Sequence, residues 1–428
     1  MNADANTGGA TTGSRGGALG YLDARQSVLA TAIPLPIEYV ALENAVGRAM
    51  AASITSPVAL PPWDNAGMDG YAVRRADVAN ASPSTPAVLR VTGTIAAGAD
   101  PFTLRPVDVG CAVRIMTGAP VPTGADGVIR IEDTDGGTVD VTIRDARDMS
   151  GRGNVRPRGE DVPLGGSLLS TGVTIGPSHL GLLASVGCAT VAVHRRPRVG
   201  LLSGGDELVL LDRFEEVLAG RRIVSSSTYA LPALLRAAGA EVSVSPLVPD
   251  TLRDTMDAIE SALSAGCDLL ITTGGVSVGA HDYTREALVQ LGGTVDFWRA
   301  RIRPGGPIGT GQILGVPWLG LPGNPVSSMV TATLFAWPLI RRLGGHANVL
   351  HRMLTATMRE RFETPASLTY FVRVVLARRA DGGYDARLAG PQGSNLLHTM
   401  AVAEALLIVP ESQAVAMPGE EFDVVLLP

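Results

Sequence analysis

The spacing of hydrophobic residues changes along the chain and divides it into stretches of different predicted structure. Between residues 21 and 54, apolar positions three or four apart in YLDARQSVLATA and ALENAVGRAMAASI predict two short helices. The loop PPWDNAGMDGYAV, rich in proline, glycine and acidic residues, follows them. From residue 70 to residue 146, short β-branched runs separated by glycine and aspartate turns predict a small β domain.

The second half of the chain shows two further patterns. Strand, loop and helix patterns are mixed over residues 147–197, and we expect this stretch to pack on the two N-terminal helices. From residue 198, strand-like runs alternate with helical runs, which predicts βαβ units and a mostly parallel sheet. The expected helices lie at residues 229–238, 252–264, 283–291 and 325–343. Strand patterns return after residue 348 and predict a C-terminal β-barrel or sandwich.

Composition excludes several classes of protein. Of 428 residues, 46% are hydrophobic and 18% are charged, so the chain can bury enough apolar surface to fold. The net charge of −6 and the aromatic content of 4% argue against a nucleic-acid partner. No apolar run reaches the roughly 18 residues of a membrane helix, and the first residues lack the features of a signal peptide. We therefore expect a soluble, cytoplasmic protein with no membrane contact.

Cysteine and lysine usage narrows the possible chemistry. The three cysteines, Cys111, Cys188 and Cys267, form no CxxC pair, and we expect buried thiols in a reducing compartment. The chain contains no lysine, which excludes Schiff-base chemistry and a P-loop lysine, although compositional bias explains the absence equally well. The motifs HExxH and Walker A are also missing from the sequence.

Three glycine turns follow strands of the predicted parallel sheet. They are SGGDE at residues 203–207, TGGVSVG at residues 273–279 and LPGNP at residues 321–325. Ligands of open α/β sheets bind at the carboxyl ends of the strands, where glycine lets the backbone approach a phosphate. Each turn alone is weak support for a binding site, but three turns in one sheet favour an anion site.

Acidic residues accompany these turns. Glu207, Asp250 and Asp282 each follow a strand of the same sheet, and carboxylates next to a phosphate cradle suit Mg²⁺. Capping of the following helices is an equally good explanation for Asp250 and Asp282.

Three arginines alternate in the segment FWRARIRPGGP. Arg299, Arg301 and Arg303 are expected on one face of an extended strand, where they would either grip phosphate or form a solvated surface.

Seven segments taken together resemble one known family. They are, in chain order, PPWDNAGMDGYAVR, RIMTGAPVPTGADGVIRIED, NVRPRGEDVPLGG, GLLSGGDEL, TTGGVSVGAHDYTREAL, RPGGPIG and GLPGNPVSS. With these segments the chain resembles the molybdopterin molybdenumtransferase (MoeA) family, which includes the C-terminal domain of gephyrin. The resemblance extends from about residue 21 to residue 428.

The resemblance implies a multidomain fold of α/β and β parts. These parts are a disordered tail (1–20), a discontinuous linker domain (21–69 with 147–197), a small β domain (70–146), a doubly wound molybdopterin-binding α/β domain (198–347) and a C-terminal β-barrel domain (348–428). The implied assembly is a homodimer.

The resemblance also implies a reaction. Adenylated molybdopterin and molybdate would react in the presence of Mg²⁺ to give molybdenum cofactor and AMP. A molybdopterin adenylyltransferase would supply the substrate, and molybdoenzymes would accept the product. The sequence leaves open whether molybdate or tungstate is inserted.

Site residues are implied position by position. The implied catalytic residues are Asp69, Glu207, Asp250 and Asp282, of which the last three would bind the metal. The residues expected to bind the substrates are Thr117, Asp161, Gly274, Gly275, Ser277, Arg299, Arg303, Pro322, Pro325 and Ser394. Judged only by their local sequence, Asp69, Thr117 and Asp161 would be structural loop residues.

The chain departs from the family pattern at several positions. Arg299, Arg303 and Gly306 stand where lysines are common, and Ser227 stands where asparagine is usual. These departures affect rate and oxyanion preference rather than the fold. A second hypothesis is therefore a catalytically weakened paralogue that binds molybdopterin or scaffolds partners as a dimer. A nicotinamide-dependent oxidoreductase is disfavoured, because no GxGxxG follows a strand with an acidic residue about twenty positions further on.

Overall fold

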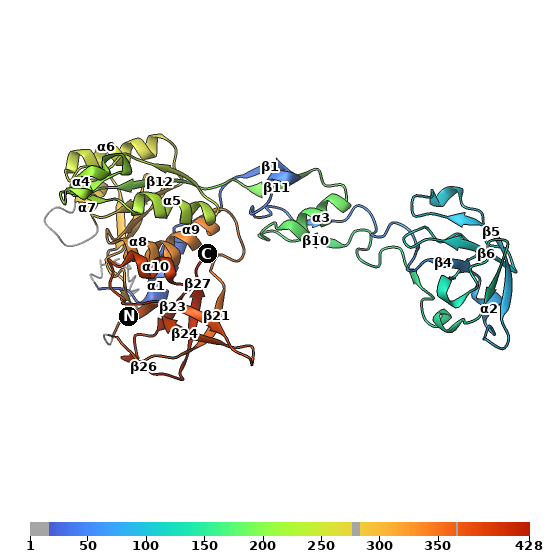
Figure 1. The fold of residues 1–428 in the computed structure, drawn as a ribbon. Helices are drawn as coiled ribbons and strands as arrows, with labels where there is room; N and C mark the ends of the chain where they lie inside the picture. The colour runs from blue at the N-terminus through green and yellow to red at the C-terminus, as the bar shows by residue number, and fades with distance from the viewer. Residues whose placement is uncertain (1–16, 276–282, 365–366) are drawn as a thin grey trace, which may run out of the picture.

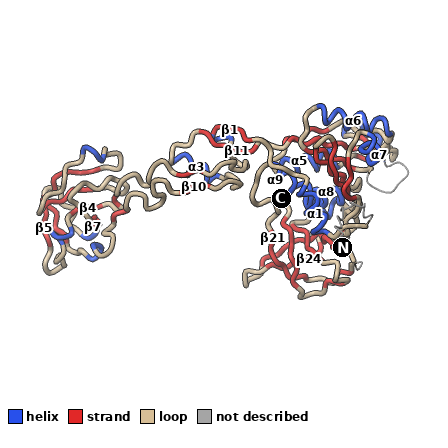
Figure 2. The backbone as a smooth tube through the Cα atoms, turned by 180° about the vertical axis from the view of Figure 1, so that it is seen from behind, coloured by secondary structure: helices blue, strands red, loops and turns tan. Residues whose placement is uncertain are grey.

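The chain forms two lobes of unequal size joined by a narrow connector (Figure 1). The computed structural model describes residues 17–275, 283–364 and 367–428. The large lobe contains the α/β sheet and the C-terminal barrel, and the small lobe contains β4 to β6. Seen from behind, the connector is mostly loop with short strands (Figure 2). Within the described residues, no helix has the length and apolar character needed to cross a membrane.

The small lobe is built on one five-stranded sheet. Its strands are β4 (Gly70–Val73), β5 (Ala87–Ile95), β6 (Cys111–Ile115), β7 (Gly127–Arg130) and β8 (Asp140–Ile143), in the order β7-β4-β6-β5-β8. The β5–β6 pair is parallel, and the other pairs are antiparallel. Apolar clusters form around the buried residues Tyr71 and Ile115, and the short helix α2 (Arg75–Val78) packs at the edge of the first cluster. The β-rich pattern expected here is confirmed.

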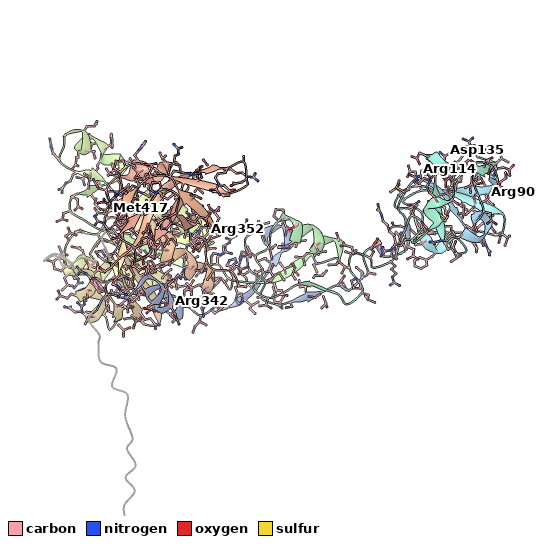
Figure 3. All side chains as sticks on the ribbon, turned by 90° about the horizontal axis from the view of Figure 1, so that it is seen from below. Arg90, Arg114, Asp135, Arg342, Arg352 and Met417 are labelled. Atoms are coloured by element: carbon pink, nitrogen blue, oxygen red, sulfur yellow. The ribbon has the colours of Figure 1, made fainter. Side chains whose placement is uncertain are left out.

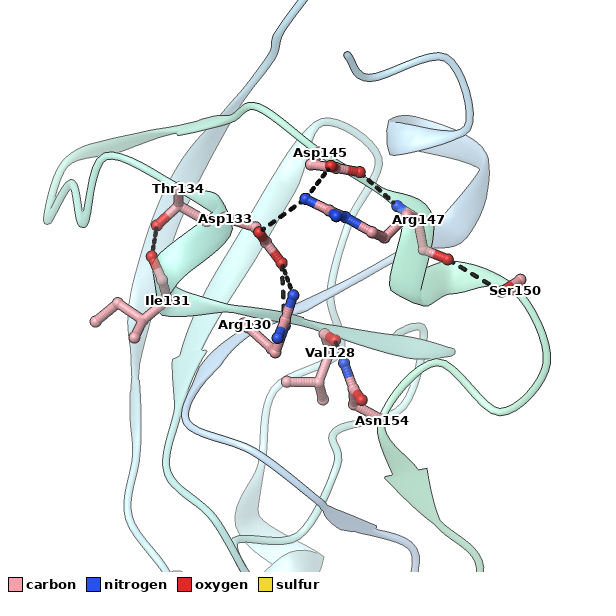
Figure 4. Close-up of polar contacts among 9 residues, drawn as sticks. All are labelled: Val128, Arg130, Ile131, Asp133, Thr134, Asp145, Arg147, Ser150 and Asn154. Atoms are coloured by element: carbon pink, nitrogen blue, oxygen red, sulfur yellow. Dashed lines mark hydrogen bonds and ion pairs between the residues drawn. The ribbon is translucent and has the colours of Figure 1, made fainter. Parts of the chain in front are cut away.

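An ion-pair network closes the end of the small lobe (Figure 4). Asp133 accepts hydrogen bonds from Arg130 at 2.9 and 3.1 Å, and Arg147 forms an ion pair with Asp145 at 2.7 Å. Asn154 donates to a carbonyl oxygen of β7 at 3.0 Å. Arg147 is exposed, and exposed ion pairs of this kind contribute about 0–1 kcal/mol each.

The connector is formed by two stretches of chain that are distant in sequence. The strands β1 (Ile37–Ala41), β2 (Ile54–Thr55) and β3 (Asn65–Ala66) pair antiparallel with β11 (Thr190–His194), β10 (Ser167–Leu169) and β9 (Val155–Arg156). Helix α3 (Pro177–Ser185) covers them, and Met50, Leu183 and Val193 form part of the buried core. The later stretch thus packs on the residues expected to form the second N-terminal helix, whereas the first helix packs in the large lobe, contrary to the expectation.

One of the two helices predicted near the N-terminus is absent. The stretch ALENAVGRAMAASI contains only a 3-10 turn at Leu42–Asn44. Gly47 has a φ of +78°, which interrupts a helix, and Ala49 and Met50 form bridges to neighbouring strands. The apolar residues spaced three or four apart are therefore buried against α3 and β11 without helical structure.

Helix α1 (Tyr21–Ala30) confirms the other N-terminal helix, but it belongs to the large lobe. The Tyr21 ring lies 4.9 Å from the Phe371 ring and 5.9 Å from the Phe335 ring, so α1 joins the barrel to the α/β part. The chain is already ordered before α1, because the Leu19 backbone donates to the Arg299 carbonyl oxygen at 3.1 Å. The end of the expected disordered tail therefore forms part of the fold, and residues 1–16 lie outside the described residues.

The α/β part contains a six-stranded, mostly parallel sheet. Its order is β15 (Glu241–Val244), β12 (Arg198–Ser203), β16 (Leu269–Thr273), β20 (Val316–Leu321), β19 (Gly309–Ile313) and β17 (Thr294–Phe297). The first four strands are parallel, and the last two add antiparallel. The chain order reverses between β12 and β16, which is the position where such sheets bind ligands.

Helices cover both faces of this sheet, as expected for a doubly wound fold. The helices are α5 (Ser227–Ala237), α6 (Leu252–Ser264), α7 (Tyr283–Gln290), α8 (Pro325–Thr331) and α9 (Trp337–Leu343). The α8 and α9 helices are continuous through a π-helical turn at Ala332–Ala336. A small segment, β13 (Leu208–Val209), α4 (Phe214–Leu218) and β14 (Ile223–Val224), was not predicted. It follows β12 directly and lies next to the cavity described below.

The C-terminal part is a closed β-barrel. Its strands are β21 (Met353–Met358), β23 (Thr369–Arg378), β24 (Tyr384–Leu388), β25 (Ala405–Val409) and β27 (Glu421–Leu426), and pairing of β23 with β25 closes the ring. Strand β18 (Ile302–Arg303) adds parallel to β23, β22 (Phe362–Glu363) pairs with β26 (Val415–Ala416), and α10 (Leu397–Val402) packs on α8 and β23. The barrel therefore contacts the basic segment directly.

Candidate active site

Turns from four parallel strands meet around one cavity. The strands β12, β15, β16 and β20 end at the same edge of the sheet, and a cavity of about 490 Å³ opens between their carboxyl ends. The predicted site residues that line it are Glu207, Asp250, Gly274, Gly275, Pro322 and Pro325. Six residues predicted from four segments of the sequence are thus brought together, while Ser277 and Asp282 lie outside the described residues.

The turn after β16 depends on its two glycines. Gly274 and Gly275 have φ values of +79° and +66°, which side chains rarely allow. The backbone therefore forms part of the cavity wall without a side chain over it, which is the arrangement that a phosphate group requires.

Asp250 does not cap the helix that follows it. The N-cap of α6 is Thr251, whose hydroxyl accepts from the Asp254 backbone N–H at 3.1 Å. The Asp250 carboxylate instead accepts from the Asp206 backbone N–H at 3.2 Å and stays exposed at the cavity. The capping explanation for Asp250 is therefore wrong, and its carboxylate is free to face a ligand.

Glu207 and Asp250 are the carboxylates that line this cavity within the described residues. In that part of the chain, no group of three or more His, Cys, Asp or Glu side chains is arranged to hold a metal. Two carboxylates remain sufficient for Mg²⁺, which usually keeps several waters and takes its other ligands from substrate phosphates.

Hydroxyl groups line another wall of the cavity. Ser225, Ser226 and Ser227 lead into α5, and the Ser227 hydroxyl lies 3.2 Å from that of Ser328 on α8. The N-terminal N–H groups of α5 therefore lie at the cavity and favour a negative charge. The sequence signal for this wall was the run of serines before a helical pattern. From the sequence, only Ser227 of this run was singled out.

The three alternating arginines have different surroundings. Ala300 and Ile302 are buried between them, so the predicted alternation is confirmed. Arg301 forms an ion pair with Glu411 at 3.0 Å and donates to the Ala18 carbonyl oxygen at 2.7 Å, so it links three parts of the fold.

Arg299 and Arg303 are exposed, and neither is among the residues that line the cavity. The Arg303 guanidinium lies 5.7 Å from the centre of the Tyr370 ring. The segment reaches the cavity at Pro307, four residues after Arg303.

Ser394 touches the cavity wall from the barrel side. Its carbonyl oxygen accepts from the Val326 backbone N–H at 3.2 Å, and its hydroxyl lies 3.4 Å from the Asn324 side-chain nitrogen. Asn324 occupies the N-cap position of α8 with Pro325 at N1, as expected, but its side chain makes no capping bond. Loop 391–394 is therefore held against the LPGNP turn.

A buried arginine lies behind this loop. The Arg373 side chain is 0% exposed, and its Nη2 donates to the Pro391 carbonyl oxygen at 3.0 Å. Among the described residues, its Nε and Nη1 atoms find no hydrogen-bond partner, and burial lowers the pKa of Arg373. Sequence reasoning missed this residue; the available signal was a lone charge in the apolar strand TYFVRVVLAR.

The remaining predicted residues lie away from this cavity. In the small lobe, the Thr117 backbone N–H and hydroxyl both donate to the Asp69 carboxylate at 2.6 Å. These two bonds lower the pKa of Asp69, with a smaller contribution from Arg114. Asp161 is exposed on the connector, where its backbone N–H bonds to the Leu60 carbonyl oxygen at 3.0 Å.

The predicted residues of the small lobe and those of the cavity thus lie at opposite ends of the molecule, with Asp161 on the connector between them (Figure 1). Viewed from below, Arg114 lies on the small lobe, whereas Arg342 and Arg352 lie on the large lobe beyond the connector (Figure 3). Within one chain, Asp69 and Thr117 do not reach the cavity that Glu207 and Asp250 line.

Comparison with known proteins covers nearly the whole chain. Residues 20–187 match the family described as "MoeA N-terminal region (domain I and II)", residues 200–342 match "Probable molybdopterin binding domain", and residues 355–427 match "MoeA C-terminal region (domain IV)". The "Molybdopterin molybdenumtransferase 2" of Mycobacterium tuberculosis is 36% identical over 391 residues, covering 90% of this chain and 94% of that protein.

Two further similarities agree with these matches. The "Molybdopterin molybdenumtransferase" of Nostoc sp. is 35% identical over 397 residues, covering 91% of this chain and 89% of that protein. The crystal structure of a molybdopterin biosynthesis moeA protein from Pyrococcus horikoshii superposes with a TM-score of 0.82 at 26% identity, covering 96% of this chain and all of that one. The chain therefore belongs to the molybdopterin molybdenumtransferase (MoeA) family, as its motifs and its fold both indicate.

Proposed function

We propose that this protein catalyses the Mg²⁺-dependent insertion of molybdate into adenylated molybdopterin, with release of AMP. The observation that carries the proposal is the cavity of about 490 Å³, in which glycine turns and carboxylates from four strand ends meet. The relatives named molybdopterin molybdenumtransferase support the same reaction. The alternative of a weakened scaffold protein is not favoured, because Glu207 and Asp250 are both present and exposed at the cavity.

The phosphates of the substrate fit the cavity wall made by backbone groups. The Gly274 backbone N–H donates to the Leu321 carbonyl oxygen at 3.1 Å, and this bond brings the Gly275 backbone to the cavity wall. The first N–H groups of α5 provide donors for phosphate oxygens. These donors do not change protonation state, so they hold the phosphoanhydride in one position while its bond breaks.

Mg²⁺ fits the donor set of the cavity. Glu207 and Asp250 offer the hard oxygen ligands that this cation prefers, and the substrate phosphates would complete its coordination. When bound, the ion neutralises the charge that develops on the phosphates.

Molybdate is the second substrate and is a doubly charged oxyanion. On the barrel side, the exposed Arg299 and Arg303 would supply positive charge for this anion, and the Ser394 hydroxyl would donate a hydrogen bond to it. The charge of the buried Arg373 behind Ser394 adds to the positive potential there. The protein then contributes positioning and charge neutralisation, and no protein nucleophile is required.

A homodimer would complete the site. Asp69 and Thr117 lie at one end of an elongated chain and the cavity at the other end (Figure 1), so a two-fold axis can place the small lobe of one chain at the cavity of its partner. A molybdopterin adenylyltransferase would supply the substrate, and molybdoenzymes would receive the cofactor.

The test is a defined reaction with the purified full-length protein. Adenylated molybdopterin, molybdate and Mg²⁺ are supplied, and both released AMP and the activity of a reconstituted apo-molybdoenzyme are measured. We expect equal amounts of AMP and active cofactor, and loss of both with Asp250→Asn. Tight substrate binding without AMP release would instead indicate the scaffold function.

A further inference from the structure

Asp206 and Asp250 hold each other through reciprocal hydrogen bonds. The Asp206 backbone N–H donates to Asp250 Oδ2 at 3.2 Å, and the Asp250 backbone N–H donates to Asp206 Oδ1 at 3.2 Å. The two residues follow β12 and β15, which are neighbours in the sheet. This pair of bonds therefore joins two strand ends directly at the rim of the cavity.

The surrounding contacts fix the Asp206 side of this pair. The Gly205 backbone N–H donates to the Val248 carbonyl oxygen at 3.3 Å, and Arg222 donates to the Asp206 carbonyl oxygen. The Ile223 backbone N–H donates to the Glu207 carbonyl oxygen at 3.0 Å. Asp206 is thus held by the Arg222 side chain and by backbone bonds of its two neighbours, whereas within the described residues the Asp250 side chain accepts a hydrogen bond from the Asp206 backbone N–H alone.

We propose that Asp206 is a positioning residue that sets the direction of the Asp250 carboxylate toward the bound metal. Asp206 does not line the cavity, so it acts through Asp250 and not on the substrate. By accepting the Asp250 N–H, the Asp206 carboxylate fixes the backbone from which the Asp250 side chain projects. The inference rests on the proposed metal-binding role of Asp250, and partners of metal ligands of this kind change metal affinity by about 10–100-fold when removed.

Two substitutions separate positioning from direct charge effects. Asp206→Asn removes the charge but keeps an oxygen that accepts the Asp250 N–H, whereas Asp206→Ala removes both. Asp212→Ala, which removes one negative charge from the segment between β13 and α4, is the matched control. Two quantities are measured. The first is the Mn²⁺ affinity of the full-length protein, by electron paramagnetic resonance, and the second is the Mg²⁺ concentration that AMP release requires.

The expected result is a rescue pattern. Asp206→Ala should weaken Mn²⁺ binding roughly 10-fold or more, while Asp206→Asn and Asp212→Ala stay near the wild-type value. Equal weakening in Asp206→Ala and Asp206→Asn would show that the charge itself acts, and no effect in either would show that Asp250 needs no support. Both results would overturn the proposal.

A second measurement keeps this proposal distinct from the proposed function. Hydrogen exchange of the Asp250 amide reports the Asp206 contact whether or not the protein binds a metal. Asp206→Ala should accelerate this exchange, and Asp206→Asn should not. If the exchange pattern appears but wild-type protein binds no Mn²⁺, the metal-binding role fails while the contact stands; if both variants exchange like wild type, the positioning role fails.

Discussion

Replacing Arg373 by methionine is expected to maintain or raise the stability of the fold and to weaken molybdate binding. The Arg373 side chain is 0% exposed, and two of its three guanidinium nitrogens have no partner within the described part of the chain. A buried ion without a compensating carboxylate carries a desolvation cost of several kcal/mol. Methionine has a similar length and no charge, so it removes this cost and fills the same space.

The balance of terms favours the methionine variant. The substitution loses the bond from Nη2 to the Pro391 carbonyl oxygen, which as a bond to a charged group is worth about 1.5–3 kcal/mol. Replacing buried ionic groups by apolar residues of similar volume is typically neutral or stabilising by about 1–4 kcal/mol. Because this range is a net effect that already includes the lost bonds, we expect the free energy of unfolding to stay unchanged or to rise by about 1–4 kcal/mol.

Urea unfolding and molybdate affinity by calorimetry test this expectation on the same protein. Arg373→Lys is the matched variant, because it keeps the charge but lacks the forked donors, and it should be less stable than Arg373→Met. A less stable Arg373→Met protein with unchanged molybdate affinity would refute the reasoning and assign the guanidinium a purely structural role.

Three further predictions follow from other parts of the molecule. Asp69→Asn should leave the fold and the oligomeric mass unchanged, because the carboxylate is exposed, but it should abolish cofactor formation. Full activity of this variant would mean that Asp69 only holds Thr117 in place. Arg303→Ala should weaken binding of molybdate or adenylated molybdopterin severely, with Arg303→Lys restoring part of it. Gly306→Lys should lower the stability slightly, because an added Cβ would lie 3.3 Å from the Ile302 carbonyl oxygen and the backbone must shift to make room. Burial lowers the pKa of His346 from 6.5 to about 3, so the unfolded chain takes up the proton first and stability falls as the pH drops from 6.5 towards 3. His346→Gln should lose this part of the acid sensitivity in urea unfolding measured across that range.

Much of the fold follows from the sequence because the period of the apolar residues is clear. Helix α6 begins and ends at Leu252 and Ser264, the residues where its pattern begins and ends. The missing helix after Leu42 shows the limit of this reasoning: residues buried from two sides at the connector also recur every three or four positions. Periodicity reports burial, and tertiary contacts decide the backbone conformation.

The site was predictable where it follows strand ends and unpredictable where it depends on burial. Glu207, Asp250 and the Gly274 turn follow directly from the rule that ligands bind at carboxyl ends of parallel strands. Arg373 could not be identified in this way, because a single charge in an apolar strand has no partner in the local sequence. Its role depends on the loop before Ser394, which the barrel brings to α8.

The central claim is that molybdate is inserted at a site shared by two chains. Mixed dimers test this claim most directly. Full-length Asp69→Asn and Asp250→Asn proteins, each inactive alone, are unfolded, mixed in equal amounts and refolded together, and AMP release with cofactor formation is measured. If each site combines the small lobe of one chain with the cavity of its partner, random pairing leaves about one quarter of the sites intact, so about one quarter of the wild-type activity should return. Activity no higher than that of the separate variants, in a sample shown to contain mixed dimers, would contradict the account.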